Sequence, residues 1–342
     1  MDLQSARELK SRLLGDVRTA AAEPGERLPV PRGFAVGIAP RRDGGFAVAI
    51  RMRDEASLGA ELTRLAEESG EDLDVRTVGQ IRPLRADPTA PDLSELQSRQ
   101  RPLVPGLSVG HPRITAGTLG GFVEYDGRLH LLSNSHVLAN SGQAALGETV
   151  VQPGVADGGN LDTDEVGTLA AFVAFDTAGP NVSDAALAVV AEAIASSPSA
   201  YPGGPLATVA TGPPVDGLVH KVGRTTGLTS GRVTAFEVDG ITVEYDVGPL
   251  TFDDQIEIEG AGDEQFSAGG DSGSVIWTAA DRAAFGLLFA GSTSGGTNGR
   301  GLTYANPLSV VLAQLGATWA GGSVGNEEPE CDGEPAHDGA PV

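Results

Sequence analysis

Cysteine is almost absent from the sequence. Cys331 is the only cysteine among 342 residues. No disulfide can therefore form within the chain, and no cysteine and histidine spacing typical of a metal site occurs. We expect a protein that is stabilised by packing alone, in a reducing, cytoplasmic location.

Long apolar runs and positive charge are also scarce. Residues 1–22 carry charged side chains throughout, so we expect neither a signal peptide nor a membrane partner. The chain has 46 Asp and Glu against 23 Lys and Arg, a net charge of −23, and the excess lies after residue 113. Such a field repels nucleic acid, so we expect no nucleic-acid partner; solubility is its simplest role.

Long helical patterns are rare, whereas turn residues are abundant. The chain contains 48 glycines and 22 prolines. Short strand-like segments follow one another from residue 117 to residue 277 without long helices between them, which favours an antiparallel sandwich or barrel. Residues 285–289 form a further predicted strand. Asn306-Pro307 is typical of a helix start, with Asn306 as the cap, so we expect a closing helix before Gly316.

The first hundred residues have a different pattern. Apolar residues recur every three or four positions from Leu3 to Ala20, which predicts an amphipathic helix that packs either on its own protein or on another subunit of a homo-oligomer. Residues 34–38, 46–52 and 73–78 are predicted strands, with a helix at 56–69. This β-β-α-β unit is interpreted as a permanent scaffold or assembly module; the alternative is an inhibitory or folding-assisting pro-segment.

These patterns together predict six regions. They are an amphipathic helix (1–24), a small β-β-α-β subdomain (25–85), a Pro-rich linker (86–113), a first β-barrel (114–200), a second β-barrel with a C-terminal helix (201–320) and an acidic disordered tail (321–342).

A serine between glycines is the strongest candidate for chemistry. Ser272 lies in Gly269-Gly270-Asp271-Ser272-Gly273-Ser274, before the apolar run 275–277. Glycines allow a sharp turn and leave little bulk around the hydroxyl, which suits a nucleophile that must approach a carbonyl. Such a serine needs a general base and donors for the developing oxyanion.

A histidine and an aspartate with suitable settings precede this serine. His136 follows an apolar strand at the point where small polar residues begin, and Asp184 precedes an apolar strand of small residues. The rival carboxylates Asp162, Asp164 and Asp176 lie among loop residues. A lone histidine is also compatible with a hydrogen-bonded core position.

The order His, Asp, Ser distinguishes one protease lineage from two others. Gly270-Asp271-Ser272-Gly273, Asn134-Ser135-His136-Val137 and Ser183-Asp184-Ala185-Ala186-Leu187 resemble the three signatures of chymotrypsin-like (trypsin-like) serine peptidases. Gly223-Arg224-Thr225-Thr226-Gly227 resembles a segment common in bacterial members. Within that superfamily, segments 136–140, 151–154 and 305–308 look closest to the NARROW LEAF 1-like plant and bacterial branch.

The resemblance implies two perpendicular antiparallel six-stranded β-barrels with the active site between them. Ser272 would attack a peptide carbonyl, His136 would transfer the proton, and Asp184 would orient the imidazole. The backbone N–H groups of Gly270 and Ser272 would form the oxyanion hole. No metal or cofactor is implied.

The same resemblance implies a substrate site. Phe266 would lie at the base of the primary pocket, and the segment Phe289-Ala290-Gly291-Ser292, with Ala290, Gly291 and Ser292, would pair with substrate backbone. An aromatic floor predicts cleavage after small or apolar residues.

Three functions are consistent with the sequence. The leading hypothesis is a selective serine endopeptidase acting on protein or peptide substrates. A catalytically silent or latent protease-fold scaffold and an esterase are the alternatives. Arg113-Ile114 superficially resembles an activation cleavage site, but the predicted strand that begins at Gly117 leaves too little chain for the new N-terminus to dock beside Asp271.

Overall fold

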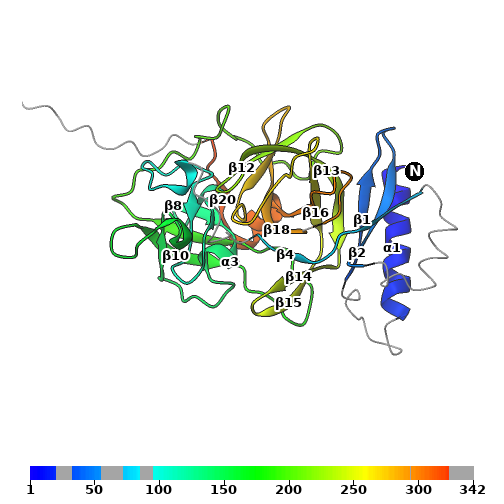
Figure 1. Ribbon diagram of the computed structural model, residues 1–342, viewed down its shortest axis with the longest axis horizontal. Coiled ribbons are helices and arrows are strands. Elements are labelled where there is room, and N and C mark those ends of the chain that lie inside the picture. The colour runs from blue at the N-terminus through cyan, green and yellow to red at the C-terminus, as the bar shows by residue number, and fades with distance from the viewer. Residues whose placement is uncertain (21–32, 55–71, 85–94, 293, 323–342) are drawn as a thin grey trace, which may run out of the picture.

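The computed structural model describes residues 1–20, 33–54, 72–84, 95–292 and 294–322. Helix α1 and strands β1 and β2 lie at one end of the molecule, a β-barrel lies in the middle, and a second sheet lies at the other end (Figure 1). The chain is mainly β with few helices, as the sequence predicts.

Six strands pair in a closed ring in the middle of the molecule. Each neighbouring pair is antiparallel, and the last strand returns to the first. The strands are, in ring order, β12 (Val219–Gly223), β13 (Gly227–Asp239), β16 (Gln255–Gly260), β19 (Thr303–Pro307), β18 (Ala284–Ser292) and β17 (Val275–Thr278). The prediction of a six-stranded barrel is confirmed here, because ring closure leaves no open edge among these strands.

The other end of the molecule is a six-stranded antiparallel sheet. Its order is β20 (Thr318–Trp319), β7 (Gly121–Tyr125), β8 (Arg128–Ser133), β11 (Ala186–Val190), β10 (Glu165–Phe172) and β9 (Thr149–Val151). A two-stranded ribbon of β5 (Ser108–Val109) and β6 (Gly117–Thr118) is bridged to β9 through Gly110 and Val151. Alternate residues of these strands form an apolar core that includes Val109, Phe122 and Leu131.

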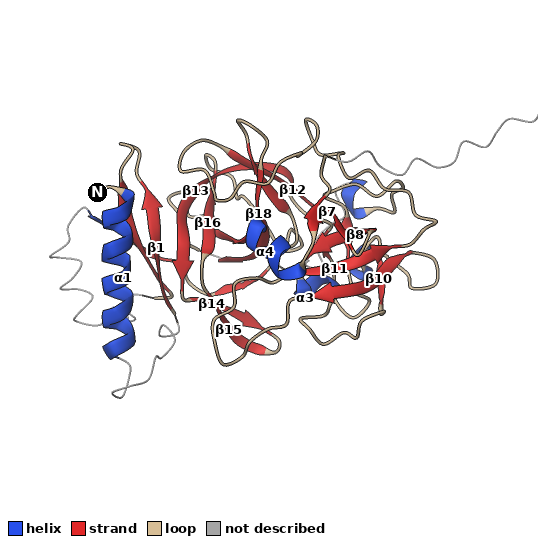
Figure 2. Cartoon of the chain, turned by 180° about the vertical axis from the view of Figure 1, so that it is seen from behind, coloured by secondary structure: helices blue, strands red, loops and turns tan. Residues whose placement is uncertain are grey.

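The C-terminal helix α4 (Leu308–Leu315) lies between the two halves (Figure 2). Its buried leucine and valine side chains pack against both the sheet and the barrel. The predicted helix is thus confirmed, but the predicted cap is wrong. Pro307 occupies the cap position, and the side chain of Asn306 bonds elsewhere.

The N-terminal elements form a layer on the barrel. Helix α1 (Leu3–Ala20) packs Leu13 and Leu14 against β1 (Phe34–Pro40) and β2 (Phe46–Met52), so its apolar stripe contacts its own protein. Strand β3 (Leu73–Thr77) pairs with β2 in parallel. The helix predicted at 56–69 lies outside the described residues, as does the predicted tail beyond residue 322.

The sheet of this layer continues into the barrel. Strand β1 pairs antiparallel with β13, through Val36–Asp239 and Ile38–Phe236. The guanidinium of Arg51 on β2 donates to both carboxylate oxygens of Glu257 on β16, each at 2.8 Å, and also pairs with Asp74 at 2.8 Å. Arg51 and Glu257 are completely buried. We call this junction, made of β1–β13 and the Arg51, Asp74 and Glu257 side chains, the anchor contact.

A short strand joins the layer to the barrel a second time. Strand β4 (Ile81–Pro83) lies between β18, to which it is antiparallel, and β14 (Ile241–Tyr245), to which it is parallel. Strand β15 (Gly248–Phe252) completes this edge by pairing with β14. The linker predicted from the Pro-rich sequence therefore begins directly after a strand that belongs to the barrel sheet.

Candidate active site

The loop before β17 carries Ser272 in a tightly packed turn. Gly270 and Gly273 have φ angles of +99° and +97°, which side chains strongly disfavour. A Cβ atom on Gly273 would lie 2.1 Å from Ser133 Oγ on β8, so there is no room for a side chain between this loop and the six-stranded sheet. The glycines that flank Ser272 in the sequence are therefore required by both conformation and space.

Asp271 fixes the shape of this loop from inside. Its carboxylate accepts hydrogen bonds from the backbone of Thr225, Thr226 and Ala268 and from the Thr226 hydroxyl, at 2.7 to 3.1 Å. Lys221 Nζ lies 3.4 Å from it, and both side chains are buried. Burial lowers the pKa of the Lys221 ammonium, while the attraction of Asp271 acts in the opposite direction. The Gly223–Gly227 segment thus orients the serine loop.

His136 and Asp184 form a buried pair. His136 lies in the short helix α3 (Ser135–Leu138), which begins two residues after β8, and Asp184 lies two residues before β11. His136 Nδ1 is 2.5 Å from Asp184 Oδ2, and the His136 backbone N–H donates to Asp184 Oδ1 at 3.1 Å. Adjacent antiparallel strands bring these residues together across 48 positions of sequence. Among the described residues, the buried His136 Nε2 has no hydrogen-bond partner.

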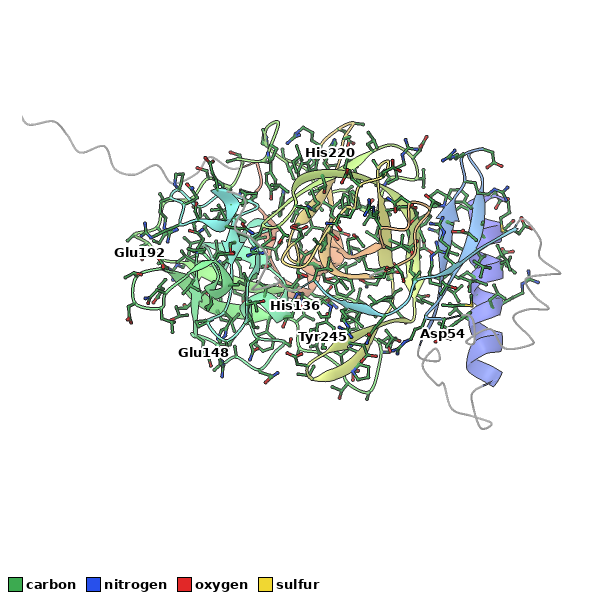
Figure 3. All side chains as sticks on the ribbon, in the orientation of Figure 1. Asp54, His136, Glu148, Glu192, His220 and Tyr245 are labelled. Carbon is green, nitrogen blue, oxygen red and sulfur yellow. The ribbon has the colours of Figure 1, made fainter. Side chains whose placement is uncertain are left out.

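Two residues that the sequence analysis missed complete the environment of Asp184. The Tyr245 hydroxyl donates to Asp184 Oδ2 at 2.7 Å, and the Tyr245 ring meets the imidazole edge to face, with 6.0 Å between the ring centres. The labels of His136 and Tyr245 lie near each other in Figure 3. Asn306 Oδ1 accepts from the Asp184 backbone N–H at 3.0 Å. Nothing in the local sequence of Tyr245 distinguishes it, and Asn306 has the pattern of a helix cap.

The rival carboxylates bond within other parts of the structure. Asp164 pairs with Arg99, and Asp176 accepts from Ala178 in its own loop. The other histidines that the structure describes bond elsewhere: His111 to Glu148, His130 to the Arg128 carbonyl and His220 to Ser230. Asp184 is therefore the carboxylate that orients His136.

Strand β6 connects the histidine side to the serine side. The Thr118 backbone N–H donates to the Ser272 carbonyl at 2.8 Å. A Cβ atom on Gly117 would lie 2.4 Å from Val137 Cγ2 and 3.1 Å from the Ser272 carbonyl oxygen. The Gly117 backbone therefore lies between Ser272 and Val137, the residue after His136, with no room for a side chain. The structure thus brings the three predicted residues to one junction between sheet and barrel.

The Ser272 hydroxyl contacts the backbone of β18 and of Leu84, the residue after β4. It donates to the Phe289 carbonyl at 3.0 Å, and it accepts from the Leu84 backbone N–H at 3.1 Å. The Gly270 backbone N–H, predicted as an oxyanion donor, donates to the Leu84 carbonyl oxygen at 2.6 Å. A peptide carbonyl therefore lies at the predicted oxyanion position next to Ser272.

The residues predicted to pair with substrate backbone do pair with a strand. Ala290, Gly291 and Ser292 of β18 lie opposite Pro83, Arg82 and Ile81, respectively. Phe266 is buried in the apolar cluster on which the Leu84 side chain packs. The sequence analysis assigned no role to residues 81–84.

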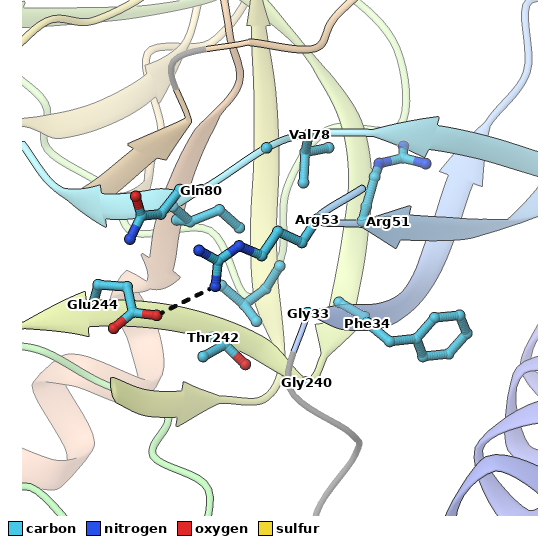
Figure 4. A pocket seen from close by; sticks show the side chains of 13 residues that line it. Gly33, Phe34, Arg51, Arg53, Val78, Gln80, Gly240, Thr242 and Glu244 are labelled. Atoms are coloured by element: carbon cyan, nitrogen blue, oxygen red, sulfur yellow. Dashed lines mark ion pairs between the residues drawn. The ribbon is translucent and has the colours of Figure 1, made fainter. Parts of the chain in front are cut away.

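The pocket in Figure 4 lies elsewhere, on the N-terminal side of β4. It has a volume of about 170 Å³, and its lining includes Arg53 and Glu244, whose side chains form an ion pair at 3.7 Å. None of the predicted catalytic or substrate-binding residues lines it. It lies between the N-terminal layer and the barrel.

Two further searches of the described residues gave negative findings. No cluster of three or more His, Cys, Asp or Glu side chains has the geometry to bind a metal ion. No helix in the described parts of the chain combines the length and the apolar character needed to cross a membrane.

Similarity to known proteins is found among solved structures. No protein-family model matches the sequence, and no curated protein sequence matches it either. Solved structures do match. Protease A of Thermobifida fusca aligns over 63% of this chain and 96% of its own, at 20% identity and a TM-score of 0.42. A glutamic acid-specific serine protease aligns over 64% and 100%, at 20% identity and a TM-score of 0.44. A chymotrypsin of Cellulomonas bogoriensis aligns over 64% and 98%, at 19% identity and a TM-score of 0.41. The structural neighbours of this chain are thus chymotrypsin-like serine proteases.

Proposed function

We propose that the protein is a serine endopeptidase that acts through Ser272, His136 and Asp184. The observation that carries this proposal is the buried His136–Asp184 contact of 2.5 Å, with His136 Nε2 left without a partner among the described residues, at the junction where Ser272 lies. A carboxylate on Nδ1 favours the tautomer in which Nε2 can accept a proton. A scaffold protein has no need of that arrangement.

The proposed mechanism assigns one role to each group. Ser272 Oγ attacks a peptide carbonyl, and His136 Nε2 takes the hydroxyl proton and later gives it to the leaving amine. Asp184 stabilises the imidazolium, while Tyr245 and Asn306 position Asp184. The Gly270 N–H stabilises the oxyanion, a contribution that is typically worth about 10²–10³ in rate.

The edge of β18 supports peptides as the substrate class. Its residues 290–292 form main-chain pairs with an extended strand, a mode that binds any peptide backbone and leaves alternate side chains to determine specificity. An esterase substrate would not need this pairing. The apolar cluster containing Phe266 supports a preference for small or apolar side chains before the cleaved bond.

The test is labelling and hydrolysis by matched variants. Wild type should react with a fluorophosphonate probe and hydrolyse peptide amides, whereas Ser272→Ala should lose the labelling and at least about 10⁴-fold of the hydrolysis rate. Ser199→Ala, which removes a hydroxyl from the loop after β11, should retain both. Hydrolysis by Ser272→Ala at the wild-type rate would contradict the role of Ser272. Absence of both labelling and hydrolysis in folded wild type would favour the scaffold or a latent enzyme.

A further inference from the structure

Positive charge gathers in one groove of an otherwise acidic protein. A cavity of about 560 Å³ lies beside the turn between β1 and β2, and four arginines line it: Arg41, Arg42, Arg76 and Arg232. We call this cavity the arginine groove. We propose that it binds an acidic peptide segment of a partner protein. None of the predicted catalytic or substrate-binding residues lines it, so it is a second site on the molecule.

The fold brings these arginines together from distant parts of the sequence. Strand β1 pairs antiparallel with β13, so Arg41 and Arg42, which follow β1, extend toward Arg232 on β13 (Figure 1). Arg232 lies opposite Glu259 of β16, and Arg76 of β3 donates to the Glu259 carboxylate at 3.3 Å. The groove therefore lies where the N-terminal layer meets the barrel, and both parts of the chain supply its charge.

The buried carboxylate of the groove is already fully bonded. Glu259 Oε1 accepts from the N–H and the hydroxyl of Thr297 and from the Asn298 N–H, and Oε2 accepts from Arg76. Arg76 also pairs with Asp74 at 3.0 Å. Glu259 is 6% exposed. Arg76 and Glu259 thus form a closed network, and the Glu259 charge is not available to neutralise the other arginines.

Two arginines of the groove remain available to a ligand. Arg42 and Arg232 are exposed, and their side chains form no ion pair or hydrogen bond with the residues that the structure describes. Arg232 is one of six basic residues after residue 113. The other carboxylate of the lining, Asp216, is exposed and accepts from the Gly217 N–H. The groove as a whole thus has four arginines against two carboxylates, in a chain whose net charge is −23.

The chemistry of the lining favours a peptide. Each guanidinium presents parallel N–H donors that fit the two oxygens of a carboxylate. Apolar side chains lie among the arginines: Val215 is 53% exposed, and Pro40 and Pro214 also line the groove. A ligand that covers both kinds of surface has carboxylates and apolar groups within a few ångströms of each other, as a peptide with alternating acidic and apolar residues does.

Other anions fit the groove less well. Inorganic phosphate would leave the apolar lining uncovered. A nucleic acid carries a charge at every nucleotide, and the charges that extend beyond the groove would be repelled by the acidic surface. A peptide with two or three carboxylates can place all of them inside the cavity.

The first experiment measures binding without hydrolysis. The full chain carrying Ser272→Ala is titrated into a short fluorescein-labelled peptide of alternating glutamate and valine, and fluorescence anisotropy is recorded. We expect this peptide to bind at least about 10-fold more tightly than the same peptide with glutamine in place of glutamate, and salt at about 0.5 M to weaken the binding. Equal affinity for the two peptides, or no binding of either, would overturn the proposal.

The second experiment reverses charges inside and outside the groove. Arg42→Glu and Arg232→Glu should each weaken binding of the glutamate peptide by about 10-fold, because each loses a charged donor and gains a repulsive carboxylate. Arg128→Glu is the matched control, since Arg128 is also exposed but lies on β8 in the other half of the molecule. Its affinity should equal that of the parent. Equal affinity in all three variants would contradict binding in the groove, and melting temperatures verify that each variant is folded.

Competition tests the choice of ligand. Unlabelled glutamate peptide should displace the labelled one, whereas single-stranded oligothymidine and inorganic phosphate should not. Stronger displacement by oligothymidine or phosphate than by the peptide would overturn the assignment to a peptide. Because anisotropy requires no catalysis, a wild type that neither hydrolyses peptides nor reacts with a fluorophosphonate would contradict the proposed function and leave this result unchanged.

Discussion

The N-terminal region contacts the barrel at two places of different character. The anchor contact joins β1 to β13 and buries Arg51 against Glu257. The second, which we call the cleft contact, consists of β4 on β18 and the two backbone bonds of Leu84. The anchor contact buries apolar side chains and a paired charge, whereas the cleft contact bonds the Leu84 backbone to Ser272 and Gly270. The anchor contact fixes the N-terminal layer on the barrel, and the cleft contact fills the edge of β18 beside Ser272.

The largest effect should follow from breaking the anchor contact. Arg51→Ala removes one partner of a completely buried ion pair and leaves the Glu257 carboxylate without its cation. We expect a loss of about 3–5 kcal/mol in the free energy of unfolding, measured by chemical denaturation. The matched control is Arg53→Ala, because the Arg53 side chain is 51% exposed and its pair with Glu244 is 3.7 Å long. Arg53→Ala should lose less than about 1 kcal/mol in the free energy of unfolding. An equal loss in Arg51→Ala and Arg53→Ala would contradict the larger contribution that we assign to the buried pair.

The cleft contact should respond to a single methyl group. The Cβ atom of Gly291→Ala would press on the leucine side chain and on the Leu302 carbonyl oxygen, 3.2 Å away. We expect the hydrolysis of a peptide amide with leucine before the cleaved bond to slow by about 10–100-fold, with little change in melting temperature. Gly286→Ala is the control on the same strand, since its new Cβ atom would meet Ala305 at 3.3 Å, away from the cleft. A similar loss of activity in both variants would indicate a general effect on β18 rather than exclusion of Leu84.

The smallest effect is expected for the pH dependence of stability, through Asp74 at the anchor contact. Burial acts to raise the pKa of Asp74, but the charges of Arg51 and Arg76 outweigh it and lower that pKa below 3.8. The stability contributed by this carboxylate is therefore fully present above its unfolded-state pKa of about 3.9, and it is lost as the pH falls through the lower pKa of the folded state. We expect Asp74→Asn to lose less than about 1 kcal/mol at neutral pH and to unfold with a weaker pH dependence below pH 4. Asp162→Asn, a change in an exposed loop, should keep the wild-type pH dependence; an unchanged profile for Asp74→Asn would contradict the assignment.

The sequence predicts the local elements of both contacts better than their partners. Residues 34–38 and 46–52 have the apolar runs of strands, and they form β1 and β2. Their periodicity contains no information on β13, whose paired residues lie about 200 positions further along the chain. Strand β16 escaped prediction because Gln255, Glu257 and Glu259 break its apolar pattern, although all three are buried. The buried Arg51, which pairs with Glu257, makes one of these charges tolerable.

The cleft contact was missed for a similar reason. Ile81-Arg82-Pro83 contains a charge and a proline, so the sequence analysis left it at the end of the predicted subdomain (25–85) without an element of its own. Its strand character depends on pairing with β14 and with residues 290–292 of β18, which are distant in sequence. The His136, Asp184 and Ser272 motifs, in contrast, could be recognised locally, because each has a short run of small residues around it. Tyr245 and Asn306 have no such run, and only the fold brings them to Asp184.

The N-terminal layer also limits how far Leu84 can move. Val78 N–H donates to the Met52 carbonyl at 2.8 Å, so the strand that ends at Leu84 is tied to the sheet only six residues upstream. A segment attached in this way has an effective concentration at its binding site on the order of millimolar. A free peptide would have to bind more tightly than this tethered strand, or be present at comparable concentration, to reach Ser272. The concentration of free peptide that is needed to displace Leu84 thus depends on the length of chain between Val78 and Leu84, independently of the chemistry at Ser272.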